Sequence, residues 1–319
     1  MGFDKRLLYE VARRYYELAI TQEEIALSLG ISRSQVSRAI KQARDEGMVI
    51  IKVIGPGLDF TDIQAEMCAR FGLREAVVVS GEGGPSQLLT QNLGVAGARY
   101  VVESLEPGTV IGVSWGATLR ELAVALVDAR GAARDVVVIP LLGGLGQASA
   151  DLQVNDIASR VASALGGTHH YLHAPSFVDT PEARATIMAD SNIKTVADMW
   201  ATVDMAVVGI GCLIRPSTLI EEGGFPESDL ELLERKGTVG DMCMRFFNSK
   251  GEPVDTSLDE RIIGVGLEQL RRIKCVVAVS GGVNKARAIL GALRTGVVDV
   301  LVTDDITARK VLDAAQQGQ

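Results

Sequence analysis

The sequence predicts an α/β protein of two domains: an N-terminal winged helix-turn-helix head, then a larger doubly wound domain with a mostly parallel sheet. Three observations predict this fold. Residues 21–44 read as two helices joined by a tight corner, short apolar runs alternate with helical segments after residue 62, and the turn-rich stretch at 55–62 separates the two patterns. A length of 319 residues suits two domains.

A first helix is expected over residues 4–19. The segment is charged, and its apolar residues recur at helical spacing, which distinguishes it from a signal peptide. Its apolar face is expected to consist of Leu7, Leu8, Val11, Tyr15 and Leu18.

The helix-turn-helix is predicted from its capping residues. Thr21 is expected to cap the first helix of the pair, with Glu24 as its capping-box partner. Gly30 is expected to end that helix, because glycine accepts the left-handed conformation that a tight corner needs. Ser32 is then expected to cap the second helix.

The second helix has the character of a DNA recognition helix. From Ser32 to Arg44 it holds four basic residues and no acidic one. Short polar side chains near its start suit base edges, and the cations suit phosphates. The alternative is an amphipathic hairpin with a solvated face. The expected DNA-binding residues are Thr21, Ser32, Arg33, Ser34, Gln35, Ser37, Arg38, Lys41 and Arg44.

A β-branched run follows the recognition helix. Residues 47–54, GMVIIKVI, are expected to form a strand packed beside that helix, which would make the head winged. The turn-rich residues after it mark the boundary between a DNA-binding domain at 1–55 and a second domain at 56–319.

The uneven distribution of charge reconciles an acidic chain with a DNA-binding head. The net charge is −8, but residues 1–54 carry 9 Lys and Arg against 7 Asp and Glu, while the remainder carries 23 against 33. An acidic body repels DNA, so non-specific binding should be modest and strongly salt-dependent.

The composition excludes several classes of protein. Hydrophobic residues make up 47% of the chain and the mean hydropathy is +0.21, which argues against disorder. No apolar run approaches the ~20 residues of a membrane span. The four cysteines, Cys68, Cys212, Cys243 and Cys275, form no CxxC pair, so neither a zinc site nor a disulfide framework is indicated.

The second domain is predicted from continuous apolar runs between helical segments, which is typical of a parallel sheet covered on both faces. Strands are expected at 76–80, 109–113, 135–141, 204–210, 275–280 and 298–303. Helices are expected at 62–71, 86–104, 117–128, 150–165, 181–189, 282–294 and 304–315. Ligands of such folds bind at the carboxyl ends of the strands.

Several strands run into glycine-rich turns that can bind an anion. The sharpest is SGGVNK at 280–285, where backbone amides at a helix start, a hydroxyl and a lysine come together. The turns at 112–118, 141–147 and 209–211 are further candidates, although glycine also serves simply to bend the chain. The candidate effector-binding residues from these turns are Ser114, Gly116, Thr118, Gly211, Ser280, Gly281, Gly282 and Lys285.

A sugar ligand would also need acceptors for its hydroxyl groups, which carboxylates and carboxamides provide. Gln147 follows a glycine turn, Asn155 begins the next helix, and Asp241 follows a glycine that leaves room for a close approach. For each, a role as a helix cap or loop residue is an equal alternative.

Two patterns point weakly to other chemistry. GVSWG at 112–116 fits the nucleophile elbow of α/β-hydrolases, but a triad needs a histidine late in the chain, whereas His169, His170 and His173 lie midway. In HHYLH, two imidazoles lack a Cys or carboxylate partner, so a packing or pocket role is expected rather than metal binding. No cofactor and no metal are expected.

The segments, taken in order, resemble the SorC (sorbitol operon regulator, or DeoR-like) family of bacterial transcription regulators over essentially the whole chain. The resemblance rests on the head at 21–53, GVSWGATL at 112–119, QVNDIASRVASALGG at 153–167, the segment 239–255 and the segment 280–305.

The resemblance implies a DNA-binding regulator of carbohydrate metabolism whose operator binding responds to a sugar, and the implied sugar is a phosphorylated one. It places the phosphate near Lys285 and the 280–285 turn, together with the 114–118 turn, and the sugar hydroxyls near Asp241. It also implies a homo-tetramer and, at 56–319, an effector and oligomerisation domain similar to sugar-phosphate isomerases. A cytoplasmic location is expected because neither a signal peptide nor a membrane span is indicated. The alternative is an isomerase with an appended DNA-binding head. However, Asp241 has no convincing His or Glu partner in the sequence, so a binder is expected rather than an enzyme.

Overall fold

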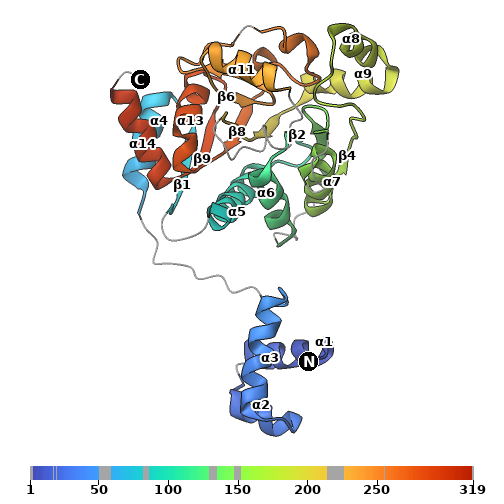
Figure 1. The fold of residues 1–319 in the computed structure, drawn as a ribbon, viewed down its shortest axis with the longest axis vertical. Coiled ribbons are helices and arrows are strands. Elements are labelled where there is room, and N and C mark those ends of the chain that lie inside the picture. The colour runs from blue at the N-terminus through green and yellow to red at the C-terminus, as the bar shows by residue number, and fades with distance from the viewer. Residues whose placement is uncertain are drawn as a thin grey trace. The chain divides into compact units, whose positions relative to one another are not determined.

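The computed structural model describes residues 3–16, 18, 20–49, 59–81, 86–128, 135–146, 152–213, 226–254 and 256–317. The chain divides into two compact units, residues 1–58 and 59–319 (Figure 1).

The head is built from α1 (Lys5–Tyr16), α2 (Gln22–Leu29) and α3 (Arg33–Asp45). All three helices contribute to one small apolar core, which excludes water from the faces that they share. Its buried members are Leu8, Val11, Ala12, Ile25, Ala26, Val36, Ala39, Ile40 and Ala43.

The predicted capping of the helix-turn-helix is confirmed. The Thr21 hydroxyl accepts a hydrogen bond from the Glu24 amide (3.3 Å), and the Thr21 amide donates to Glu24 Oε2 (3.0 Å). Gly30 adopts the left-handed conformation, with φ 64°. Ser32 caps α3, and a second capping box forms because the Ser32 amide donates to Gln35 Oε1 (2.8 Å). These contacts stabilise the turn between α2 and α3, because the backbone amides at the start of each helix find hydrogen-bond partners in neighbouring side chains.

Two expectations for the first helix were wrong. Tyr15 and Leu18 were expected on its apolar face, but they are 36% and 54% exposed. The helix ends at Tyr16, so Leu18 does not continue the face, and the Tyr15 ring lies edge-on against Tyr16 instead (centroids 5.0 Å apart). The expected wing at 47–54 lies mostly outside the described residues. In its described part, Gly47 lies in a turn and residues 48–49 form no strand.

The second unit contains a seven-stranded sheet in which every pair of neighbouring strands is parallel. Its order is β1 (Glu75–Val79), β9 (Val300–Asp304), β8 (Cys275–Val279), β5 (Met205–Val208), β2 (Val110–Val113), β3 (Val137–Pro140) and β4 (Thr168–His169). The six predicted strands are confirmed, and β4 is a short edge strand that was not predicted.

Helices cover both faces of this sheet, as a doubly wound fold requires (Figure 1). One layer contains α5 (Ser86–Ser104), α6 (Ala117–Asp128) and α7 (Val154–Leu165), and the other contains α4 (Thr61–Phe71), α13 (Ala286–Arg294) and α14 (Asp305–Gln316). The helices α8 (Pro181–Ala189), α9 (Ser191–Asp198), α11 (Glu227–Arg235) and α12 (Leu267–Leu270) lie in the connections. None of the described helices is long and apolar enough to cross a membrane.

A two-stranded antiparallel hairpin, β6 (Thr238–Met242) and β7 (Arg245–Asn248), was not predicted. Its turn holds Cys243 and Met244 at φ values of 52° and 60°, in the left-handed region that favours glycine. Residue Asp241, just before this turn, forms a bridge with Gly211 after β5, so the hairpin docks on the carboxyl edge of the main sheet.

The contact between α5 and α6 depends on Gly94. A methyl group at this position would lie 2.6 Å from the Glu121 Cβ atom and 2.7 Å from the Leu122 amide nitrogen, so the helices would have to separate. We expect Gly94→Ala to lower the free energy of unfolding of this domain by about 1–3 kcal/mol. Chemical denaturation measures the effect. Gly146→Ala, where the added methyl meets open space, is the matched control and should change stability little.

Candidate functional site: a cavity at the carboxyl edge of the sheet and a basic head

A cavity of about 630 Å³ lies where β2, β5, β8 and β9 end. The chain leaves β2 toward β3 and leaves β5 toward β8, so the order of strands reverses between β2 and β5. Ligands of doubly wound folds bind at this kind of reversal. The cavity therefore lies where the fold predicts a ligand.

Most of the candidate effector-binding residues meet at this cavity, although they come from four separate segments. Those that line it are Ser114, Gly116, Thr118, Gly211, Asp241, Gly281, Gly282 and Lys285. Gln147 lies outside the described residues.

Two candidates do not line the cavity. Ser280 is fully buried, and its hydroxyl donates to the Ile210 carbonyl (3.2 Å), so it holds two strand ends together. The Asn155 amide group is bonded to the backbone of Leu172 through both its oxygen (3.0 Å) and its nitrogen (3.1 Å). Both side chains thus serve the fold, and the expectation that they contact a ligand needs this correction.

Asp241 supplies a buried carboxylate with unused hydrogen-bonding capacity. Its Oδ2 accepts from the Met244 amide (3.0 Å), whereas Oδ1 has no partner among the described residues. Backbone bonds to Gly211 in both directions (3.0 and 3.3 Å) fix it against the end of β5. A side chain at Gly211 would collide with Oδ1, so the glycine permits this approach. Burial raises the pKa of Asp241 to about 6, from an ordinary value of 3.8.

Lys285 brings a cation to the same part of the cavity. Its ammonium group donates to the Ile210 carbonyl (3.0 Å), one residue before Gly211. Burial lowers the pKa of Lys285, and the neighbouring Cys212 and Asp241 partly oppose this effect. A half-buried cation and a buried carboxylate in the wall of one cavity can together orient a polar ligand.

The 280–285 turn is less open to an anion than its sequence suggests. The Gly282 amide already donates to Asp304 Oδ2 (2.7 Å), and Asp304 also caps α14 through the Thr307 amide (2.9 Å). One amide expected to bind an anion is therefore taken by the protein's own carboxylate, which lies in the cavity wall. Asp304 could not be singled out from the sequence, because its position is also typical of an ordinary helix cap.

The start of α6 offers a second group of donors. Gly116, with φ 140°, precedes this helix, and Ala117 and Thr118 begin it in the cavity wall. The first amides of a helix have no partner within the helix and carry partial positive charge. Trp115 was also missed: its indole lines the cavity, and its Nε1 has no hydrogen-bond partner among the described residues.

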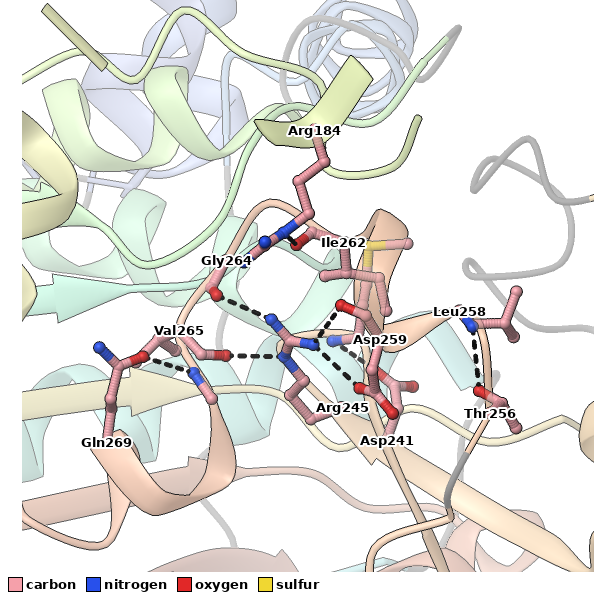
Figure 2. A network of polar contacts seen from close by, with 12 residues as sticks. Arg184, Asp241, Arg245, Thr256, Leu258, Asp259, Ile262, Gly264, Val265 and Gln269 are labelled. Atoms are coloured by element: carbon pink, nitrogen blue, oxygen red, sulfur yellow. Dashed lines mark hydrogen bonds and ion pairs between the residues drawn. The ribbon is translucent and has the colours of Figure 1, made fainter. Parts of the chain in front are cut away.

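Arg245 ties the hairpin to the rest of the site (Figure 2). Its guanidinium donates to the carbonyls of Val265 (3.1 Å), Gly264 (2.9 Å) and Asp259 (3.2 Å), and to the Asp259 carboxylate (2.9 Å). The adjoining chain then bonds to the end of β3, because the Val265 amide donates to the Leu141 carbonyl (2.8 Å). Arg245 lies on β7, which pairs with β6, the strand that carries Asp241. The network therefore fixes Asp241 indirectly, through the hairpin.

The three histidines lie outside the cavity wall. The rings of His169 and Tyr171 meet edge-on (4.6 Å), and those of Tyr171 and His173 are stacked (5.5 Å). The described residues contain no group of three or more His, Cys, Asp or Glu side chains that could hold a metal ion. Ring packing is the contact that the structure shows for this segment.

In the head, the candidate DNA-binding residues of α3 are exposed, except that Gln35 is half-buried. The side-chain Oε1 atom of Gln35 and the Ser32 hydroxyl both accept hydrogen bonds in the capping box, so these two residues also stabilise the start of the helix. Arg38 donates to the Ser34 carbonyl one turn earlier (3.3 Å). The exposed polar residues of α3 are Arg33, Ser34, Ser37, Arg38, Lys41 and Arg44, which supply hydroxyl donors and cations.

Comparisons with known proteins agree with this two-part architecture. Residues 56–313 match the family model "Putative sugar-binding domain", and residues 5–65 match the model "Crp-like helix-turn-helix domain". The sorbitol operon regulator of Klebsiella pneumoniae is 34% identical over 97% of this chain and 98% of its own length. The chain belongs to the SorC family.

Other relatives of this SorC-family regulator lead to the same assignment. The deoxyribonucleoside regulator of Bacillus subtilis is 31% identical over 97% of this chain and 98% of its own. The crystal structure of full-length SorC from Klebsiella pneumoniae superposes with a TM-score of 0.76 at 32% identity, over 98% of this chain and 100% of that one. The chain is accordingly a DNA-binding transcription regulator with a sugar-binding domain, and not an enzyme.

Proposed function

We propose that the cavity binds a phosphorylated sugar and that its occupancy changes the affinity of the head for operator DNA. The observation that supports this most directly is that Lys285 and the Asp241 carboxylate both line the cavity at the strand reversal. A sugar hydroxyl can donate to Asp241 and accept from Lys285 at once. The phosphate is assigned to the start of α6, because the Gly282 amide is already taken.

The names of the relatives fit a ligand that carries hydroxyl groups. They include regulators of sorbitol, of deoxyribonucleosides and of erythritol catabolism. An effector can shift DNA binding only if it binds one arrangement of the heads more tightly than another.

A panel of ligands tests the proposal. Thermal unfolding of the full chain should be measured with phosphorylated sugars and with the corresponding free sugars and polyols, because a ligand that binds only the native state raises the midpoint. We expect a rise with one sugar phosphate that is lost in Lys285→Met. If only free sugars raise the midpoint, the effector carries no phosphate and that part of the proposal is refuted. If no ligand of the panel raises the midpoint, the proposed sugar-binding site is refuted.

In the head, we propose that the exposed polar residues of α3 contact operator DNA. We expect Arg38→Ala to weaken operator binding by roughly 1–3 kcal/mol if its guanidinium contacts a base, while effector binding is unchanged. Fluorescence anisotropy with labelled operator DNA measures the first effect, and the thermal midpoint with effector measures the second. Equal losses on specific and random DNA would instead assign Arg38 to the phosphates.

We further propose that the regulator is a cytoplasmic homo-tetramer. A protein that binds operator DNA works where the chromosome is, and paired half-sites suit a protein with several heads. Light scattering on the purified full chain measures the assembly, and a monomer at micromolar concentration would contradict the tetramer.

A further inference from the structure

The first two turns of α3 carry the polar side chains that can reach base edges, and the structure shows which of them are free to do so. Arg38 is exposed and Gln35 is half-buried. No carboxylate lies between Ser32 and Arg44, so this stretch has no acidic group to accept from cytosine N4. The start of a recognition helix is the part that contacts base edges. The base that α3 recognises therefore depends on the donors and acceptors that remain free there.

Gln35 is the residue that would recognise adenine, but its side-chain oxygen is already occupied. Oε1 accepts from the Ser32 amide (2.8 Å) and from the Ser32 hydroxyl (3.0 Å). A carboxamide oxygen has two lone pairs, so both are in use. Recognition of adenine needs a carboxamide that accepts from N6 and donates to N7 at once. Breaking the capping box to make that contact would leave the Ser32 amide without an acceptor, which offsets the gain.

Arg38 is free for a base contact, and its side chain already points toward the start of the helix. Its Nε donates to the Ser34 carbonyl (3.3 Å), one turn earlier, so the side chain lies back along α3. Its two terminal nitrogens have no hydrogen-bond or ion-pair partner among the described residues. Arg33 is the other arginine near the helix start, but its Nη1 lies 4.0 Å from the Glu23 carboxylate, which competes for its donors.

We propose that α3 recognises guanine through Arg38 and that Gln35 contacts no base. Guanine presents two adjacent acceptors, O6 and N7, in the major groove, and a guanidinium donates to both. Because the Nε of Arg38 is held by a carbonyl, the two terminal nitrogens are left for this pair of acceptors. Gln35 is a positioning residue that stabilises the helix start from which Arg38 is presented. The inference rests on the proposed contact between α3 and operator DNA and specifies its chemistry.

Modified bases test the contact with guanine. Duplexes selected from a random pool by the wild-type full chain provide the probes, and each guanine of the selected site is replaced in turn by 7-deazaguanine. This base lacks the N7 acceptor but keeps its base pairing and its phosphate. At the guanine that Arg38 contacts, the replacement should lower the affinity of the wild type by about fivefold or more. For Arg38→Ala the same replacement should change nothing, because the donor to N7 is already absent.

Two further variants complete the test. Lys41→Ala is the matched control, since it removes another exposed cation about one turn further along α3. It should lower the affinity for modified and unmodified duplexes by the same factor. In Gln35→Glu the carboxylate can still accept in the capping box but cannot donate to a base. The preference among the four bases should therefore stay that of the wild type at every position.

The outcomes separate this inference from the proposed function of the head. If no guanine replacement depends on Arg38 while Lys41→Ala still weakens binding, the guanine contact is overturned. A changed preference at an adenine in Gln35→Glu would overturn the assignment of Gln35. If neither Arg38→Ala nor Lys41→Ala changes the affinity for any duplex, α3 does not contact DNA, and the proposed function of the head fails together with this inference.

Discussion

Replacement of Arg245 by methionine is expected to lower the free energy of unfolding of the sugar-binding domain by about 3 kcal/mol or more. The side chain is only 11% exposed, and it donates to three backbone carbonyls and one carboxylate. Methionine fills a similar volume but leaves those acceptors without donors. Urea denaturation followed by circular dichroism measures the loss.

An exposed arginine provides the control for this prediction. Arg99 pairs with Glu103 on the surface of α5, where the side chains are 79% and 59% exposed. Arg99→Met should cost at most about 0.5 kcal/mol, because exposed ion pairs contribute little. If the two variants lost equal stability, the network around Arg245 would not be what holds the hairpin. Ligand binding should also weaken in Arg245→Met, since the network positions the strand that carries Asp241.

The second large effect is expected for Asp241→Asn, as a change in how stability depends on pH. The unfolded chain releases the Asp241 proton near 3.8, and the folded chain releases it only near 6. The folded state therefore holds the proton more tightly, and stability falls as the pH rises through this window. The wild type should lose about 2 kcal/mol between pH 4 and pH 8 from this group, a loss that the asparagine variant escapes.

Asp241→Asn should at the same time lose its response to the effector, because a neutral amide cannot replace a charged acceptor. At neutral pH the variant would thus be more stable than the wild type but would not respond to the effector. Asp204→Asn is the matched control with the opposite sign. Its hydrogen bonds to Lys274 (2.6 Å) and to the Val110 amide (3.1 Å) hold the pKa of Asp204 below its usual range, so that stability is lost as the pH falls. Parallel pH profiles for wild type and Asp241→Asn would show that this carboxyl is not buried as described.

The main sheet could be predicted from the sequence because its central strands are buried on both faces and appear as unbroken apolar runs. The strand β4 could not, since two residues leave no periodic signal. The hairpin of β6 and β7 was missed for another reason. Its turn uses Cys243 and Met244 at positive φ, where a glycine or asparagine would have marked the turn in the sequence.

In the candidate site, too, some residues could be located from the sequence and others could not. Residues that follow buried strands and precede helices, such as Lys285 and Gly116, were located because the carboxyl ends of parallel strands meet. The direction of a side chain was not available from the sequence, and so Ser280 and Asn155 were expected in a cavity that neither reaches. Asp304 was missed because one carboxylate serves both a helix cap and a glycine turn.

The order of strands also has a consequence for synthesis on the ribosome. The first strand of the sugar-binding domain, β1, pairs along its length with the last one, Glu75 with Val300 and Val79 with Asp304. A growing chain must therefore wait for its final segment before this sheet can close, whereas the head depends only on contacts within its own short span. In a nascent or truncated chain, the helices of the head can fold before the sugar-binding domain is complete. Premature termination would therefore produce a DNA-binding protein that cannot respond to the effector.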